Sequence, residues 1–153
     1  MLRIVALLTI LATTTHAKTI TGRASVIDGD TLEIHGQRIR LSAIDAPEGG
    51  QTCLDTSGKP WRCGTMAARA MDDLTAGKTL SCDPRDVDRY GRIVAVCTAG
   101  GVDVGAALVQ AGLAVAYRKY GLDYVADEQA AQNAGRGMWA GRFDMPWDWR
   151  KAH

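Results

Sequence analysis

Residues 19–44 alternate between apolar and polar side chains, and this pattern constrains the fold more than any other part of the chain. The alternation runs through "TGRASVI", "TLEIH" and "RIRLSAI", with the turn sequences "DGD" and "GQ" between them. Because successive side chains of a strand point to opposite faces, a period of two is typical of strands buried on one side. The three runs therefore predict an antiparallel meander of three strands.

The rest of the chain predicts two more strands and about three helices. Apolar residues recur at helical spacing in 65–77, where Gly77 is a stop signal. A short helix is expected in 104–112, and a last one near 123–135 that ends at "GRGMW". The sequences "KTLSC" and "RIVAVC" flank the charged turn "DPRDVDRYG" and indicate a hairpin. Five short strands with a helix inserted after the third predict an α+β fold, and an OB-fold five-stranded β-barrel with about three helices fits this count.

The first 17 residues predict a secretory signal peptide. They contain one basic residue, a short apolar run and a small-residue end, so we expect cleavage after Ala17. The alternative, a retained membrane anchor, is disfavoured because the apolar run is shorter than the roughly 20 residues that span a bilayer. Residues 18–153 then suit a single domain, expected to be a secreted or periplasmic monomer without membrane attachment.

The chain has 18 basic and 17 acidic side chains, and removal of the signal peptide with Arg3 leaves them balanced. A polyanionic partner would therefore be attracted by local patches of charge and not by the net charge.

Four cysteines in an exported chain favour disulfide bonds, because the compartment is oxidising and no C-x-x-C pair is present. Three connectivities are possible. Cys53 and Cys63 bracket one loop, whereas Cys82 and Cys97 end the two strands of the predicted hairpin. Pairing 53 with 63 and 82 with 97 therefore satisfies loop geometry with the least rearrangement.

Three aspartates lie where strands of the predicted meander begin or end. Asp28 ends the first strand, Asp30 begins the second and Asp45 ends the third, each on the face of its apolar neighbours. These positions share one end of a meander, so three carboxylates are expected to converge at the mouth of the barrel. Glu48, in "IDAPE", brings a fourth to the same rim.

Carboxylates crowded on a partly desolvated face repel one another, and they take up a proton or need a cation. Oxygen ligands without clustered histidines suit Ca²⁺ or Mg²⁺, and Ca²⁺ is the better fit outside the cell. The alternative is that "DGD" is only a tight turn with local hydrogen bonds. The acids of "IDAPE" favour the cation site.

Two arginines could complete a site that cleaves phosphodiesters, because guanidinium groups stabilise negative charge on phosphate oxygens without giving up a proton. Arg40 lies in the third predicted strand and Arg92 starts the fifth. Simple alternation puts Arg40 on the opposite face from Asp45. Only a bulge, a strong twist or the closing barrel would bring the two together.

Four motifs, "IDGDT", "RLSAIDAPE", "DRYGR" and "GLAVAY", occur in this order, and together they resemble the staphylococcal nuclease (thermonuclease) family over about residues 20–139. The resemblance implies an OB-fold barrel with three helices. It also implies a Ca²⁺-dependent endonuclease that hydrolyses DNA and RNA with little sequence preference and leaves 3′-phosphate ends.

The resemblance further implies a role for each acidic residue of the rim. Asp30 and Asp45 would bind Ca²⁺ through their carboxylates, and Ala46 would bind it through its backbone carbonyl. Asp28 would lie close by, one layer further from the ion. Glu48 would be the general base that activates water.

The basic and aromatic residues of the motifs receive roles in the same way. Arg40 and Arg92 would grip the phosphate, and Arg92 would also help the 5′-oxygen to leave. Arg89, Tyr90 and Tyr117 would hold the terminal phosphate and the base of the nucleotide, because aromatic faces stack on bases of any sequence.

Two alternatives to an exported nuclease stay open. One is an OB-fold module that binds nucleic acid without cleaving it, and the other is a structural protein stabilised by Ca²⁺. Outside the motifs, Glu128 is expected on a solvated helix face. Trp147 and Trp149, in "PWDWRKAH", are expected to cap the fold or to lie in a frayed tail.

Overall fold

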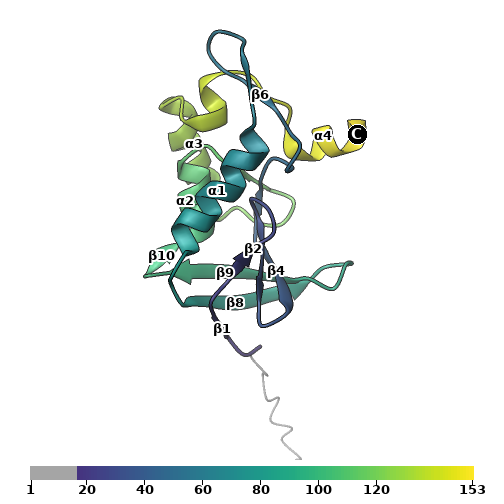
Figure 1. Ribbon diagram of the computed structural model, residues 1–153, viewed down its shortest axis with the longest axis vertical. Helices are drawn as coiled ribbons and strands as arrows, with labels where there is room; N and C mark the ends of the chain where they lie inside the picture. Colours follow the sequence, from purple (N-terminus) through teal and green to yellow (C-terminus); the bar gives the residue numbers. More distant parts are fainter. Residues whose placement is uncertain (1–16) are drawn as a thin grey trace, which may run out of the picture.

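The computed structural model describes residues 17–153, so the predicted signal peptide lies outside the described residues except for Ala17. Most strands form one sheet in the order β1-β8-β9-β4-β3-β2, and β10 pairs with β9 beside this path (Figure 1). The strands of this sheet are β1 (Ile20–Gly22), β2 (Ser25–Val26), β3 (Thr31–Ile34), β4 (Gln37–Leu41), β8 (Leu80–Val87), β9 (Ile93–Ala99) and β10 (Val102–Asp103).

The predicted meander is present, and its first strand reaches both edges of the sheet. β2, β3 and β4 pair antiparallel in sequence order. β1 and β2 follow one another closely in the chain, yet β1 pairs with β8 at one edge and β2 pairs with β3 at the other. β4 also pairs in parallel with β9. One stretch of chain therefore borders both edges, which is the connectivity of an OB-fold, and the predicted α+β fold is confirmed.

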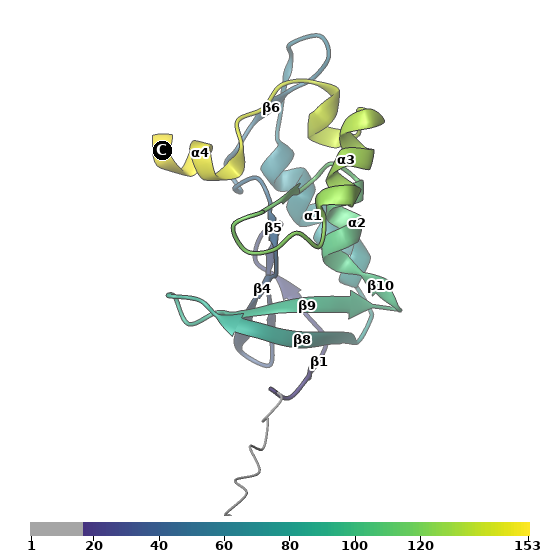
Figure 2. The same ribbon diagram turned by 180° about the vertical axis from the view of Figure 1, so that it is seen from behind.

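The three predicted helices are confirmed, and a fourth that was not predicted follows them. They are α1 (Cys63–Thr75), α2 (Val104–Gln110) and α3 (Val125–Asn133), and a 3₁₀ turn, η1 (Gly137–Ala140), leads to α4 (Pro146–Ala152). The first three helices gather on one side of the molecule (Figure 1 and Figure 2). α4 lies on the other side, toward which the turn between β8 and β9 also points.

A main core lies between the barrel and the helices, and a smaller one holds the C-terminal segment. The main core is built from fully buried side chains of the sheet and of α1 and α2, among them Leu32, Ile34, Ile39, Leu41, Met71, Leu80 and Leu108. The smaller cluster contains four buried residues with five partly buried ones packed against it, among them Cys53, Cys63, Val115, Met138, Phe143, Met145 and Trp147. The residues before and within α4 are thus attached to the protein by apolar contacts.

Both disulfides have the pairing that loop geometry favoured. Cys53–Cys63 joins β6 (Cys53–Leu54) to the first residue of α1 and encloses β7 (Pro60–Trp61). Cys82–Cys97 joins β8 to β9 at two positions that lie directly opposite each other. Among residues 17–153, no helix is both long and apolar enough to cross a membrane.

The segment expected to form the charged turn of the hairpin is mostly strand. β8 continues to Val87, with a bulge between Pro84 and Asp86, so only the residues after Val87 form the turn. The bulge keeps the pairing with β9 while adding one residue to the strand.

A turn at Ser42 and Ala43 breaks the third predicted strand in two. Ala43 has a φ of 56°, in the left-handed region that non-glycine residues seldom adopt. β4 ends before this turn, and β5 (Ile44–Asp45) pairs with β11 (Val115–Ala116) instead of the main sheet. The prediction that Asp45 follows the face of β4 by simple alternation is therefore wrong, because a period of two does not continue through such a turn.

Glu128 was expected on a solvated helix face, and it is buried instead. Only 2% of this α3 residue is exposed. Its carboxylate accepts hydrogen bonds from the backbone N–H of Ala116 at 3.0 Å and from Arg118 Nη2 at 2.6 Å. The carboxylate therefore ties α3 to β11, which leads into Tyr117.

Substituting alanine for Gly64 should destabilise the fold, whereas the same change at Gly49 should not. A Cβ on Gly64 would lie 1.7 Å from the backbone oxygen of Glu48, but one on Gly49 would meet nothing within 4 Å. Because backbone must shift to relieve this overlap, we expect Gly64→Ala to lower the free energy of unfolding by about 1–3 kcal/mol or more. Urea denaturation checks this prediction, and equal midpoints for the two variants would contradict it.

Candidate active site

Asp28, Asp30 and Asp45 lie close together at one rim of the barrel, and Asp45 reaches it through the turn at Ala43 and not by strand alternation. The backbone N–H of Asp30 donates to Asp28 Oδ1 at 3.1 Å. Arg40 Nη2 lies 3.5 Å from Asp30 Oδ2 and 3.0 Å from Asp45 Oδ1, so one nitrogen reaches both carboxylates. The backbone N–H of Ala46 donates to Asp30 Oδ2 at 2.9 Å. Asp30 is 7% exposed and Asp45 is fully buried.

Burial strongly perturbs two of these carboxyls. Desolvation raises the pKa of Asp45 to about 6, although the hydrogen bonds from Arg150 oppose this shift. Desolvation also raises the pKa of Asp28 to about 6, and the negative charge of Asp30 adds to the effect. The ionised cluster is therefore unfavourable by itself, and positive charge at the rim stabilises it.

The metal-free protein should lose stability as the pH rises from about 4 to about 7. Because folding raises the pKa of Asp28 and Asp45, their contribution to stability is fully present below the unfolded value of 3.8. It is lost as the pH rises through the folded value of about 6. Two pKa units on the fully buried Asp45 correspond to about 3 kcal/mol.

Thermal unfolding in chelator at pH 5 and pH 7 measures this loss. Although burial raises the pKa of Asp88, hydrogen bonds from Arg92 outweigh it and lower that pKa. The contribution of Asp88 is therefore lost only as the pH falls below 3.8, outside this window. Asp45→Asn should make the stability depend less on pH. A wild-type protein that is more stable at pH 7 than at pH 5 would contradict the prediction.

Arg40 is fixed among the acids by its own backbone surroundings. Its Nη1 donates to the carbonyl oxygens of Leu41 at 3.2 Å and of Ile44 at 2.9 Å. The turn at Ala43 brings these carbonyls and Asp45 round to the side of Arg40. This turn supplies the contact that simple alternation of side chains could not explain.

Arg92 reaches the same rim from the start of the β9 region. Its Nε donates to Asp88 Oδ2 at 2.7 Å, and its Nη1 lies 3.4 Å from Thr31 Oγ1. The hydroxyl of Thr31 in turn donates to Asp30 Oδ1 at 3.0 Å. Asp88 Oδ1 also accepts from the backbone N–H groups of Tyr90 and Arg92. One carboxylate therefore holds both the hairpin turn and the arginine that points from it.

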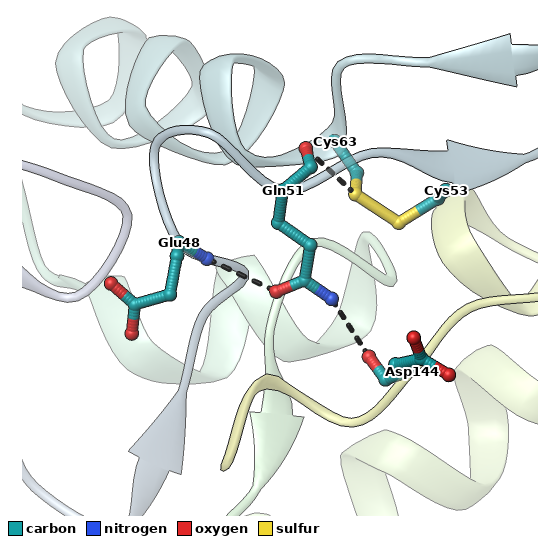
Figure 3. The surroundings of a disulfide bond; sticks show 5 residues. All are labelled: Glu48, Gln51, Cys53, Cys63 and Asp144. Carbon is teal, nitrogen blue, oxygen red and sulfur yellow. Dashed lines mark hydrogen bonds between the residues drawn. A yellow bond between two sulfur atoms is a disulfide. The ribbon is translucent and has the colours of Figure 1, made fainter. Parts of the chain in front are cut away.

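Glu48 is positioned through its backbone by a buried glutamine. Figure 3 shows Gln51 between Glu48 and the Cys53–Cys63 disulfide. Gln51 Oε1 accepts from the backbone N–H of Glu48 at 3.2 Å, and its Nε2 donates to the carbonyl oxygen of Asp144 at 2.8 Å. Gln51 is completely buried. The disulfide, Glu48 and the segment leading to α4 are thus connected through one residue, whose backbone carbonyl contacts Cys63 and whose side chain makes the other two contacts.

Arg150 of α4 is a third guanidinium at the rim, and the sequence did not predict it. Its Nη1 donates to Asp45 Oδ1 at 3.0 Å and to Glu48 Oε1 at 2.7 Å. Its Nη2 donates to Asp45 Oδ2 at 2.9 Å. The hydrogen bonds to Asp45 raise the pKa of Arg150, with those to Glu48 adding to the shift, so its charge is fixed.

The three residues expected to hold a nucleotide lie in two places near the rim. Arg89 Nη2 donates to Tyr90 Oη at 2.6 Å, and the Arg92 guanidinium lies 5.5 Å from the centre of the Tyr90 ring. Tyr90 is 69% exposed. Tyr117 directly follows β11, and its ring stacks on Trp147 with centroids 5.1 Å apart and an interplanar angle of 13°.

The oxygen atoms at the rim are of the type that a hard cation binds. Within residues 17–153, no three His, Cys, Asp or Glu side chains are grouped so that they could hold a metal ion. A site here would need Asp30, Asp45 and the Ala46 carbonyl, all oxygen donors of the type that Ca²⁺ prefers. Guanidinium groups of Arg40 and Arg150 already contact Asp45, so the rim accommodates positive charge.

Sequence reasoning missed four residues that organise this site, namely Asp88, Thr31, Gln51 and Arg150. The i, i+4 spacing of Asp88 and Arg92 in "DRYGR" was a usable signal for the pair. Thr31 is next to Asp30 in "IDGDT", which was a usable signal as well. Gln51 and Arg150 act across long sequence separations, and nothing in their local sequence indicates a role at the rim.

Comparison with known proteins shows the family to which this chain is similar. Residues 38–141 match the family described as Staphylococcal nuclease homologue. The chain is 45% identical over 127 residues to "Succinoglycan biosynthesis protein ExoI" of Rhizobium meliloti, covering 80% of this chain and 66% of that protein. It is 34% identical over 145 residues to "Micrococcal nuclease" of Shigella flexneri, covering 83% of this chain and 78% of that protein.

A further relative is "Uncharacterized endonuclease" of Escherichia coli, which is 36% identical over 133 residues, with coverage of 82% of this chain and 80% of that protein. The family match covers most of the barrel and the first three helices, and the two nuclease relatives are covered over most of their length. The chain therefore belongs to the staphylococcal nuclease family.

Proposed function

We propose that this protein is a Ca²⁺-dependent nuclease that hydrolyses phosphodiester bonds in DNA and RNA with little sequence preference and leaves 3′-phosphate ends. Its nuclease relatives support activity on nucleic acids. The observation that carries the proposal is the convergence of two arginines on one buried acidic rim. Arg40 contacts Asp30 directly, and Arg92 approaches it through the hydroxyl of Thr31.

The two arginines would bind the phosphate whose ester bond breaks. Each guanidinium carries parallel N–H groups that match phosphate oxygens and stay charged throughout the reaction. Asp88 accepts a hydrogen bond from Arg92 Nε, so the guanidinium is held in one position, from which its Nη groups would bind phosphate. Negative charge that develops on the phosphate oxygens and on the departing 5′-oxygen would be stabilised by donors already in position.

Glu48 would take the proton of the attacking water. Its backbone is fixed by Gln51, while its side chain is 33% exposed and therefore accessible to water. Ca²⁺ held by Asp30, Asp45 and the Ala46 carbonyl would supply positive charge to the phosphate, with Asp28 supporting the cluster from behind. Proton transfer to Glu48 would accompany attack at phosphorus, and the bond to the 5′-oxygen would break.

Arg89, Tyr90 and Tyr117 would hold the rest of the nucleotide. The exposed ring of Tyr90 is adjacent to the guanidinium groups of Arg89 and Arg92. Tyr117 is the residue after β11, the strand that pairs with β5. Stacking on aromatic rings contributes about 1–3 kcal/mol per base and does not depend on base identity. This kind of contact suits a nuclease with little sequence preference.

Cleavage assays test the proposal directly. The purified protein should degrade plasmid, single-stranded DNA and RNA with Ca²⁺ and should not degrade them in chelator. The products should become substrates for end extension only after treatment with a 3′-phosphatase. Binding of the same nucleic acids without cleavage at any Ca²⁺ concentration would instead identify a non-catalytic OB-fold module.

We also propose that the protein is exported and acts as a single-domain monomer. Two disulfides are compatible with an oxidising compartment. N-terminal sequencing of protein isolated from outside the cytoplasm should begin at Lys18, and sedimentation should give the mass of one chain.

A further inference from the structure

α4 brings two side chains onto the proposed catalytic machinery from a part of the chain beyond residues 38–141, the segment that matches the family. Arg150 contacts the acidic rim, and Trp147 contacts the proposed base-stacking tyrosine. These are two different kinds of contact, ionic and aromatic, on the surfaces proposed to take a cation and a nucleobase.

The ionic contact occupies both oxygens of the Asp45 carboxylate and one oxygen of Glu48. Arg150 donates to both oxygens of Asp45 and also to Glu48 Oε1, at distances between 2.7 and 3.0 Å. An oxygen that accepts from a guanidinium cannot at the same time give that lone pair to Ca²⁺. A guanidinium also supplies positive charge to the buried Asp45 in the metal-free protein, which is the electrostatic role of a bound cation.

The aromatic contact covers the nucleotide-binding face in a similar way. The indole of Trp147 lies nearly parallel to the Tyr117 ring, at 13° and 5.1 Å between centroids. A nucleobase stacking on Tyr117 needs the same parallel geometry. Tyr120 approaches Tyr117 edge-on, at 77°, and so does not cover the face in this manner.

The polar contacts of α4 are of a kind that can be exchanged, whereas Trp147 also packs against the smaller apolar cluster. Among the described residues, the hydrogen bonds that α4 side chains make to other elements all come from Arg150, because Lys151 bonds to Asp148 and His153 bonds to Trp149. The Arg150 side chain is 37% exposed, so water is available to receive it. The attachment before α4 runs from Asp144 through Gln51 to the backbone N–H of Glu48, and so does not use the carboxylates that Arg150 contacts.

We propose that α4 is an intramolecular competitor of both ligands: Arg150 competes with Ca²⁺ for Asp45, and Trp147 competes with the nucleobase for the face of Tyr117. The inference rests on the proposed Ca²⁺-dependent nuclease function. Ca²⁺ would displace Arg150 from the rim, and a nucleotide would displace Trp147 from Tyr117. When both are bound, they would displace α4 completely. Binding of Ca²⁺ and of nucleotide should therefore be positively coupled, since each removes part of the cost that the other meets.

Calorimetric titration of CaCl₂ into the purified protein tests the ionic half without any reading of activity. Arg150→Gln should bind Ca²⁺ at least about tenfold more tightly than the wild type, because hydrogen bonds to charged groups are strong enough to shift an equilibrium by that factor. Lys151→Gln is the matched control, since it removes the same charge from the same helix and should leave the affinity within about twofold. Arg150→Lys keeps the charge but loses the guanidinium fork, so its Ca²⁺ affinity should lie between those of Arg150→Gln and the wild type.

Each outcome of this titration is decisive. Weaker or unchanged Ca²⁺ binding by Arg150→Gln would overturn the competition while leaving the proposed Ca²⁺ site in place. Heat of binding absent from all four proteins would overturn the Ca²⁺ dependence itself, and the competition with it. Circular dichroism and the Ca²⁺-induced rise in Tm provide a second readout, which should be larger for Arg150→Gln than for the wild type.

Titration with thymidine 5′-phosphate at saturating Ca²⁺ tests the aromatic half. This mononucleotide has no phosphodiester bond to hydrolyse, so only binding is measured. Trp147→Ala should bind it several-fold more tightly than the wild type, whereas Trp149→Ala should bind it equally. Weaker binding by Trp147→Ala would show that the indole forms part of the nucleotide site and would overturn its role as a competitor.

Discussion

Arg92→Ala should lower kcat for cleavage of DNA and RNA by about 10²–10³-fold. Loss of one preorganised donor to a developing negative charge raises a barrier by about 2.7–4 kcal/mol. Arg92 meets this description because Asp88 fixes its Nε at 2.7 Å, and only 24% of its side chain is exposed. Rates under saturating Ca²⁺ and substrate measure the effect on kcat separately from binding.

Two further variants distinguish the guanidinium fork from simple charge. Arg92→Lys keeps the charge but cannot bind two phosphate oxygens in a fixed plane, so we expect most of the loss to persist. Arg85→Ala removes an exposed arginine from β8 of the same hairpin and should change kcat by less than about threefold. A tenfold or smaller effect of Arg92→Ala would show that this side chain is not the clamp.

The sequence predicts the barrel well because its strands alternate over a buried face. Leu32, Ile34, Ile39 and Leu41 are all essentially inaccessible, and their spacing alone fixes which side of β3 and β4 faces inward. The convergence of Asp28 and Asp30 follows from the same pattern, because both lie at the turn between paired strands β2 and β3.

The contact between Arg40 and Asp45 could not be derived, because it depends on a single unfavourable dihedral. Ala43 adopts a positive φ that no sequence preference of alanine indicates. Contacts distant in the chain hold this turn, among them the pairing of β5 with β11, more than sixty residues later, and the bond from Ser42 N–H to the Ala95 carbonyl. The local pattern therefore predicts the position of each residue along the strand but not the direction of the side chain after the turn.

α4 escapes prediction for a different reason. Its 7 residues are too few for an amphipathic pattern, and isolated helices of this length do not form in water. Proline at its start favours helical backbone locally, but packing of Met145 and Trp147 against the cluster around Cys53 and Cys63 supplies the stabilisation. Such a helix exists only in its tertiary context, and so do the contacts that Arg150 makes.

Glu48→Gln should lower kcat by about 10²–10⁴-fold, the usual contribution of a positioned general base. Glutamine keeps the size of the side chain and the backbone contact with Gln51, but it cannot accept the proton of water. KM should change little, because the phosphate clamp remains. Glu33→Gln, at a partly exposed position of β3, is the control and should retain nearly full activity.

Comparison with Arg150→Gln separates this chemical role from a structural one. If Glu48 is the base, kcat of Glu48→Gln should stay low whether or not Arg150 is also replaced. If Glu48 served only to hold Arg150, at 2.7 Å from its Nη1, the variant should resemble Arg150→Gln, with tighter Ca²⁺ binding and an undiminished kcat. Because one carboxylate contacts both α4 and the proposed site of water attack, measuring kcat and Ca²⁺ affinity on the same two variants assigns each function to its residue.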